Sequence, residues 1–177
     1  GSSDIAQYIY SRAAATGKET FNSEKVEGLK EWSLYGSPSA DGERVYVPAM
    51  KQNQQDVHII AISAAAEPKL LWSTSLGTYK NNQQMWYYQM ERSVQPTLLL
   101  HDGRLYADTH AGSLVELDAS SGRIDWAVNY VSETSIQHRF FMWGMPMNGS
   151  SLTVSPPMIV DGVLYVKGMK STRLYAI

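Results

Sequence analysis

Histidine and aspartate are the residues of this chain that could support a metal site or acid–base catalysis. The four histidines are His58, His101, His110 and His138, and their spacing does not match that of zinc ligands. A hairpin could bring His101 close to His110, but a zinc site needs three or four ligands. Cysteine is absent, which excludes disulfides, thiolate catalysis and cysteine zinc sites. We therefore predict no metal site and no catalytic residue.

Three Asp-Gly pairs mark turns rather than an active site. They begin at Asp41, Asp102 and Asp161, and successive pairs lie 61 and 59 residues apart. Asp-Gly suits tight hairpins because both residues tolerate positive φ. No paired-carboxylate pattern, nucleophile elbow or phosphate-binding loop is present. The regular spacing of the pairs indicates an internal repeat.

Two polar-flanked segments, "NNQQMWYYQMER" (81–92) and "QHRFFMWGMPMNGSS" (137–151), are rich in aromatic residues and methionine. Such side chains form adaptable apolar surfaces, and long insertions on a rigid scaffold often carry binding sites. The alternative is that the segments pack on each other or on the adjoining sheet. The candidate interaction surface comprises Met85, Trp86, Tyr87, Tyr88, Met90, Phe140, Phe141, Met142, Trp143 and Met145.

Composition limits the remaining function classes. The chain has 177 residues, of which 44% are hydrophobic and 18% charged, as expected of a folded globular protein. The 15 basic and 17 acidic residues give a net charge of −2, and no basic block is present. No apolar run approaches the ~20 residues of a membrane span. We therefore predict no nucleic-acid partner and no membrane span.

The elements that would position these residues form a repeat of short β-strands. Residues 94–130 divide into four strands of an antiparallel meander. The same pattern occurs at 36–72, and at 154–177 without its fourth strand. The first two copies close on Trp72 and Trp126. The predicted strands of the central copy are Thr97–His101, Arg104–Thr109, Ser113–Asp118 and Arg123–Tyr130.

The stretch "GSLVELDASSGRIDW" (112–126) resembles the repeat of PQQ-like (quinoprotein-type) β-propellers, in which it is known as the tryptophan-docking motif. Asp118, Gly122 and Trp126 match that motif. The copy ending at Trp72 is looser, because Ser63 replaces the aspartate and the turn glycine is lost. The resemblance implies that Trp32, Trp72 and Trp126 pack across blade junctions, while Asp118 and Gly122 shape the turn. These roles are structural.

The predicted fold is all-β. It contains about three propeller blades' worth of four-stranded antiparallel meanders, which form a partial or incomplete propeller. A short helix is favoured over residues 4–15, and residues 15–21 compete with 28–34 as the last strand of an earlier blade. The predicted order is an N-terminal segment (1–27), an orphan outer strand (28–34), blade 1 (35–77), a first insert (78–92), blade 2 (93–130), a second insert (131–152) and three strands of blade 3 (153–177).

The resemblance also implies a function and a location. The layout looks most like that of large multi-repeat proteins of the bacterial envelope, so we expect a periplasmic or cell-envelope fragment that acts as a non-catalytic scaffold for protein contacts. The alternative is part of a PQQ-dependent dehydrogenase, which would require PQQ with Ca²⁺. No residue matches a ligand of that cofactor by motif, and we predict no cofactor. The expected partner is another protein, the remaining blades of the parent propeller, or a strand-exchanged homodimer.

Overall fold

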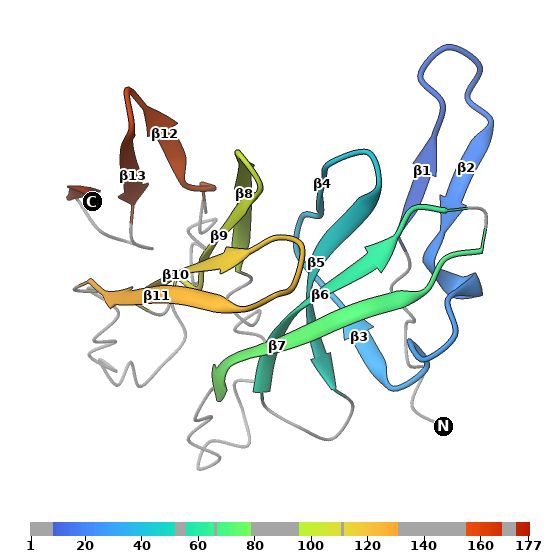
Figure 1. The fold of residues 1–177 in the computed structure, drawn as a ribbon, viewed down its shortest axis with the longest axis horizontal. Helices are drawn as coiled ribbons and strands as arrows, with labels where there is room; N and C mark the ends of the chain where they lie inside the picture. The colour runs from blue at the N-terminus through green and yellow to red at the C-terminus, as the bar shows by residue number, and fades with distance from the viewer. Residues whose placement is uncertain are drawn as a thin grey trace, which may run out of the picture.

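The computed structural model describes residues 9–51, 56–65, 67–78, 96–110, 112–130, 155–167 and 173–177. Their regular structure is almost entirely antiparallel β-sheet, with one short 3-10 helix at Ser23–Lys25. Successive sheets follow one another across the molecule in chain order (Figure 1). The predicted all-β fold of propeller-type blades is confirmed. No helix in the described part of the chain is long and apolar enough to cross a membrane.

Blade 2 is a regular four-stranded meander. Its strands are β8 (Thr97–His101), β9 (Arg104–Asp108), β10 (Ser113–Asp118) and β11 (Ile124–Asn129), paired in the order β11-β10-β9-β8. The β8–β9 corner is tight because Asp102 and Gly103 both adopt positive φ, 48° and 74°. These strands coincide closely with those predicted from the alternating pattern.

Blade 1 contains β5 (Arg44–Lys51), β6 (Asp56–Ser63) and β7 (Leu70–Thr78). Its inner strand is interrupted, because β3 (Trp32–Leu34) and β4 (Ser39–Ala40) both pair with β5. This differs from the prediction that residues 28–34 are the outer strand of an earlier blade. The prediction rested on the spacing between Gly28 and Trp32. Such local spacing does not specify which other strand these residues pair with.

The N-terminal hairpin consists of β1 (Tyr10–Arg12) and β2 (Glu19–Asn22). A helix over 4–15 is therefore wrong for the described residues 10–12, and residues 1–8 lie outside the described part. Two backbone hydrogen bonds in the turn between β1 and β2 explain why these residues form a hairpin. Ala13 N–H donates to Lys18 O at 2.8 Å, and Gly17 N–H donates to Ala13 O at 2.8 Å.

The same two hydrogen bonds close the docking turn of blade 2. Asp118 N–H donates to Arg123 O at 2.9 Å, and Gly122 N–H donates to Asp118 O at 2.8 Å. Gly17 and Gly122 have similar φ values, 68° and 72°. The N-terminal hairpin thus has the local geometry of the third and fourth strands of a blade, as the competing interpretation of residues 15–21 required.

Blade 3 comprises β12 (Met158–Val160), β13 (Val163–Lys167) and β14 (Leu174–Ala176), paired in the order β12-β13-β14. The Asp161-Gly162 corner joins β12 to β13, and Asp161 has a φ of 49° like Asp102. The three strands and the corner follow the pattern of blade 2.

The hydrophobic core is divided into three clusters that lie between neighbouring sheets. Alternate residues of a strand point to opposite faces, so Val45 and Val47 pack with Phe21 of the N-terminal hairpin, whereas Tyr46 packs with Leu105 of blade 2. A third cluster joins blades 2 and 3. Each blade is stabilised by its neighbours because a single sheet cannot bury both of its faces.

Candidate functional site

The junction between blades 1 and 2 is built around Trp72. Its indole Nε1–H donates to the Ala119 carbonyl at 3.2 Å, and the Thr74 hydroxyl donates to the Gly122 carbonyl at 2.6 Å. The Trp72 ring also packs against Tyr46, with centroids 5.9 Å apart. The tryptophan at the end of one blade therefore contacts the turn of the next blade.

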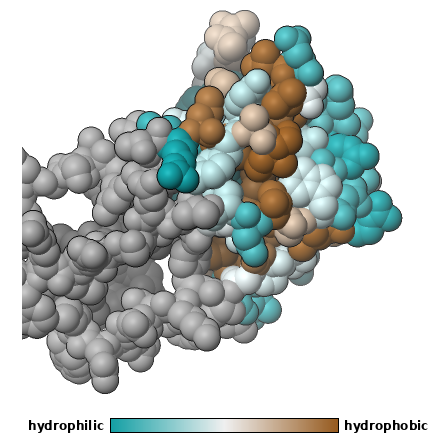
Figure 2. All heavy atoms as spheres, turned by 90° about the vertical axis from the view of Figure 1, so that its left-hand side faces the viewer, coloured by the Kyte–Doolittle hydropathy of each residue, from teal (hydrophilic) through white to brown (hydrophobic). Residues whose placement is uncertain are grey.

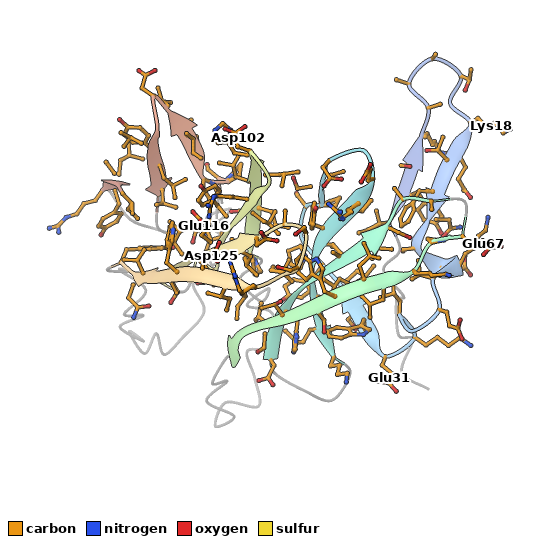
Figure 3. The ribbon with its side chains drawn as sticks, viewed as in Figure 1. Lys18, Glu31, Glu67, Asp102, Glu116 and Asp125 are labelled. Carbon is orange, nitrogen blue, oxygen red and sulfur yellow. The ribbon has the colours of Figure 1, made fainter. Side chains whose placement is uncertain are left out.

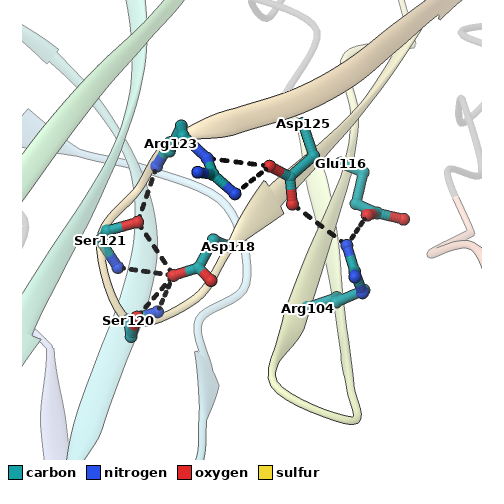
Figure 4. A network of polar contacts seen from close by, with 7 residues as sticks. All are labelled: Arg104, Glu116, Asp118, Ser120, Ser121, Arg123 and Asp125. Atoms are coloured by element: carbon teal, nitrogen blue, oxygen red, sulfur yellow. Dashed lines mark hydrogen bonds and ion pairs between the residues drawn. The ribbon is translucent and has the colours of Figure 1, made fainter.

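The turn that receives Trp72 is shaped by Asp118. One of its carboxylate oxygens accepts hydrogen bonds from the backbone N–H and the hydroxyl of both Ser120 and Ser121 (Figure 4). These bonds, led by that from the Ser120 hydroxyl, stabilise the ionised form and lower the pKa of Asp118 to about 2. The carboxylate thus maintains the turn and is unsuited to acid–base catalysis near neutral pH.

Trp126 has the equivalent position in blade 2. Its ring lies 6.2 Å from that of Tyr106 and borders the cluster that contains Leu164 of blade 3. Trp32 differs, because its ring meets His58 edge-on at 5.0 Å within blade 1 and lies 5.7 Å from Lys51 Nζ. Phe21 occupies the interblade position instead, where it is buried against blade 1. Phe21 lies in residues 15–21, the competing candidate for the last strand of an earlier blade.

A polar network covers the outer part of blade 2. Arg104 contacts the carboxylates of Glu116 and Asp125, and Arg123 Nη2 lies 2.8 Å from Asp125 Oδ1 (Figure 4). Glu116 is buried although it is an acidic residue. Figure 3 shows Glu116 and Asp125 at neighbouring positions in this blade, while Lys18, Glu31 and Glu67 lie at the periphery. Because both arginines are largely exposed, we treat the network as structural.

A second polar cluster lies at the opposite end of blade 2 and is fully buried. The Asp108 and His110 side chains have no exposed surface. One carboxylate oxygen of Asp108 accepts from His110 N–H at 2.8 Å and from the Tyr130 hydroxyl at 2.5 Å. The other lies 3.3 Å from His110 Nδ1. His110 Nε2 lies 2.9 Å from the Thr97 hydroxyl, and that hydroxyl lies 3.4 Å from the Ser155 carbonyl.

Burial controls the protonation of this pair. It raises the pKa of Asp108 and lowers that of His110, and in each case the partner's charge opposes the shift. His110 also has a φ of 54°, which is unusual for a residue other than glycine. In the sequence, His110 stands out only as a histidine beside a turn. The Asp-Thr-His sequence at 108–110 gives no signal that its side chains are buried.

The candidate interaction residues at 85–90 and 140–145 lie outside the described residues, so their arrangement stays a prediction. The described strands show where the two inserts are attached to the blades. Residues 79–95 connect β7 to β8, and residues 131–154 connect blade 2 to blade 3. Thr78 pairs with Asp56, and Thr97 pairs with Asp108, so both ends of the first connection are at the edge opposite the Asp-Gly corners.

A metal or a quinone cofactor would need a set of convergent ligands. No group of three or more His, Asp or Glu side chains in the described part could hold a metal ion.

Comparison with known proteins finds matches among solved structures. No family model matches the sequence, and no curated protein matches it. A europium-containing methanol dehydrogenase aligns over 75% of this chain and 20% of its own, with 18% identity and a TM-score of 0.46. Myxococcus xanthus glutaminyl cyclase aligns over 96% of this chain and 56% of its own, with 14% identity and a TM-score of 0.45. The chain spans less than two thirds of either protein.

Proposed function

We propose that this chain is part of a PQQ-like β-propeller repeat protein of the bacterial envelope and acts there as a non-catalytic scaffold for protein contacts. One observation carries the proposal: both aromatic inserts are attached at the same end of a stack of blades. Asn129, near the start of the second connection, pairs with Ser113 at the edge where Thr97 pairs with Asp108. A stack of blades to which two aromatic-rich segments are attached at one end suits partner binding.

The test separates binding from folding. Trp86→Ala and Trp143→Ala should weaken the affinity for an envelope protein that is first identified by crosslinking and then purified, while the melting temperature stays unchanged. Leu71→Ala, at an exposed position of β7, is the matched control. A lower melting temperature together with unchanged affinity would favour inserts that pack as a satellite core.

The alternative function is that of a quinoprotein propeller, and it can be tested by measuring whether PQQ with Ca²⁺ binds to the chain. A ligand that binds only the folded state raises the melting temperature, and the rise grows with the logarithm of the ligand concentration once this exceeds the dissociation constant. A rise on addition of PQQ with Ca²⁺, beyond that with Ca²⁺ alone, would contradict the non-catalytic proposal. An unchanged melting temperature is the expected result.

The outer face of blade 3 supports the view that further blades adjoin this one. Ile59, Leu114 and Leu174 have equivalent places in blades 1, 2 and 3, as their strand register shows. The first two are 0% exposed, whereas Leu174 is 63% exposed. Met158 of the same blade is also exposed. Figure 2 views the side of the molecule on which blade 3 lies and shows apolar residues gathered in a band.

We propose that a further blade of the parent propeller covers this face, as blade 2 covers Ile59. Because residues 1–177 contain no cysteine, Leu174→Cys provides a single site for maleimide labelling within this part of the parent protein. In the parent protein the label should react slowly at every protein concentration, while Leu71→Cys should react fast. Fast labelling of Leu174→Cys in the parent would contradict the proposal. Protection that increases with the concentration of the isolated chain would instead indicate a second copy, as in a strand-exchanged homodimer.

A further inference from the structure

The N-terminal hairpin matches the third and fourth strands of a blade in strand register as well as in its turn. The pairing of β1 with β2 shifts directly after Ser11 pairs with Phe21. It shifts at the same point in blades 1 and 2, directly after the pairs that contain Trp72 and Trp126. Because such a bulge marks one defined place in a strand pair, Phe21, Trp72 and Trp126 occupy equivalent positions. The turns that precede them are therefore equivalent too.

The turn of blade 2 is covered by the tryptophan of blade 1, whereas the hairpin turn (residues 13–18) is largely exposed. Ala119 is 2% exposed beside Trp72, and a Cβ atom at Gly122 would lie 2.5 Å from the indole. The equivalent residues of the hairpin turn are Ala14 and Gly17, because both turns close with the same two hydrogen bonds. Ala14 is exposed, and in the described part of the chain a Cβ atom at Gly17 would have no neighbour within 4 Å. The hairpin turn thus has the backbone of a docking turn, and no described aromatic ring covers its glycine.

One residue beside the hairpin turn differs from its counterparts. Ile62 and Leu117 lie at the bulges of blades 1 and 2, pack against the preceding sheet and are 0% exposed. Arg12 has this position in the hairpin and is exposed. Its Nη1–H donates to the Gly17 carbonyl at 3.1 Å. In blade 2 the equivalent carbonyl accepts from the hydroxyl of Thr74 of blade 1. Arg12 therefore makes, within the hairpin, the hydrogen bond that a neighbouring blade makes at the other junction.

The charge of Arg12 limits what can cover the turn. A guanidinium carries five N–H donors and no acceptor, and the Gly17 carbonyl satisfies one of them. An apolar or donating side chain over this group would leave a buried charge without a partner, which is unfavourable. A carboxylate is the best complement because it can accept two parallel hydrogen bonds from a guanidinium. The residue that takes the place of Thr74, two positions after the docking aromatic residue, should therefore be acidic.

We infer that the hairpin turn is the docking site for another blade of the parent propeller, whose closing strand carries an aromatic residue followed two positions later by an acidic one. The ring covers Gly17 as Trp72 covers Gly122, and the carboxylate pairs with Arg12. The site lies at the end of the stack opposite blade 3 (Figure 1). The inference rests on the proposed function in taking the parent protein to be a propeller, and it does not require the scaffold role.

The first experiment measures how fast a cysteine in the hairpin turn of the parent protein reacts with a maleimide. Ala14→Cys should react at least about tenfold more slowly than Ala15→Cys, because the docked blade must first open locally. Ala15→Cys is the matched control, since Ala15 is equivalent to Ser120, which stays exposed although Trp72 is docked on the same turn. Equal rates for the two variants would overturn the inference.

A crosslink identifies the docked segment without altering the residues that it covers. Ala15→Cys carries a benzophenone maleimide, and the parent protein is irradiated and digested. The crosslinked peptide should lie outside residues 1–177 and should contain an aromatic residue followed two positions later by Asp or Glu. A crosslink to a peptide within residues 1–177, or to a peptide without this pair of residues, would contradict the inference.

Arg12→Leu tests the acidic residue. Leucine is the residue at the equivalent position 117 of blade 2, so the hairpin should keep its fold. Loss of the ion pair should speed the labelling of Ala14→Cys several-fold, because the carboxylate of the docked blade is left buried without its partner. Arg12→Lys, which keeps the charge, should retain most of the protection. Slower labelling in Arg12→Leu would show an apolar neighbour instead and would contradict the inference.

The proposed function fails separately. Slow labelling of Ala14→Cys together with unchanged partner affinity in Trp86→Ala and Trp143→Ala would keep this docking site and remove the scaffold role. Equal labelling rates together with a loss of partner affinity in those two variants would keep the scaffold role and remove the docking site.

Discussion

The indole of Trp72 lies directly over Gly122 of the neighbouring blade. A Cβ atom at Gly122 would be 2.5 Å from ring atoms Cδ2 and Cε3 of Trp72, and the glycine has a φ of 72°. The absence of a side chain at Gly122 is therefore required twice, once by the turn and once by the contact with the ring.

Gly122→Ala should lower the free energy of unfolding through both effects. A non-glycine residue at positive φ costs about 1 kcal/mol or more, and displacement of the indole adds to this cost. Gly103→Ala is the matched control, because Gly103 has a φ of 74° and a Cβ atom at that position would have no neighbour within 4 Å. Urea unfolding should show the larger loss for Gly122→Ala, and equal losses would contradict the docking contact.

Trp72→Phe should remove one hydrogen bond while retaining an aromatic ring. The Ala119 carbonyl loses the indole donor, so we expect a loss of about 1 kcal/mol in the free energy of unfolding. Thr74→Val, which removes the hydroxyl bound to Gly122 O, should give a similar loss. Leu71→Ala, at an exposed position of the same strand, should change the urea midpoint little.

The Asp118 turn should make stability sensitive to strong acid. The folded-state pKa of Asp118, about 2, lies below the ordinary value of 3.8 that applies to the unfolded chain. A depressed pKa contributes stability that is present above 3.8 and is lost as the pH falls through about 2. Asp118→Asn should flatten the dependence of the urea midpoint on pH in this window. Asp161→Asn, at the Asp-Gly corner of blade 3, is the matched control.

Phe21 and Trp32 provide a test of which aromatic residue joins the N-terminal hairpin to blade 1. Phe21 is buried in the interblade cluster, whereas Trp32 borders that cluster from within blade 1. Phe21→Ala should cost about 3–5 kcal/mol and should expose the hairpin to amide hydrogen exchange. Trp32→Ala should leave the exchange of β1 and β2 amides slower than Phe21→Ala does. Faster exchange of the β1 and β2 amides in Trp32→Ala than in Phe21→Ala would indicate that Trp32, and not Phe21, joins the hairpin to blade 1.

Much of the local architecture could be predicted from the sequence. Alternating apolar residues, Asp102-Gly103 and Asp161-Gly162 predicted strands and corners that the structure contains, because side-chain alternation and positive φ are properties of a few adjacent residues. The same reasoning failed at residues 28–34, where Gly28 and Trp32 matched the motif by spacing. The insert residues proposed for binding stay predictions.

The sequence by itself determined the strands, the corners and the repeat, since these depend on neighbouring residues. Only the tertiary structure decided that Trp32 belongs to blade 1, that Phe21 joins the hairpin to it, and that Trp72 rests on Gly122. Only the tertiary structure buried Asp108 with His110 between the attachments of both inserts. Each of these depends on the pairing of distant segments, and burial and hydrogen bonding across such distances are set by how the sheets stack.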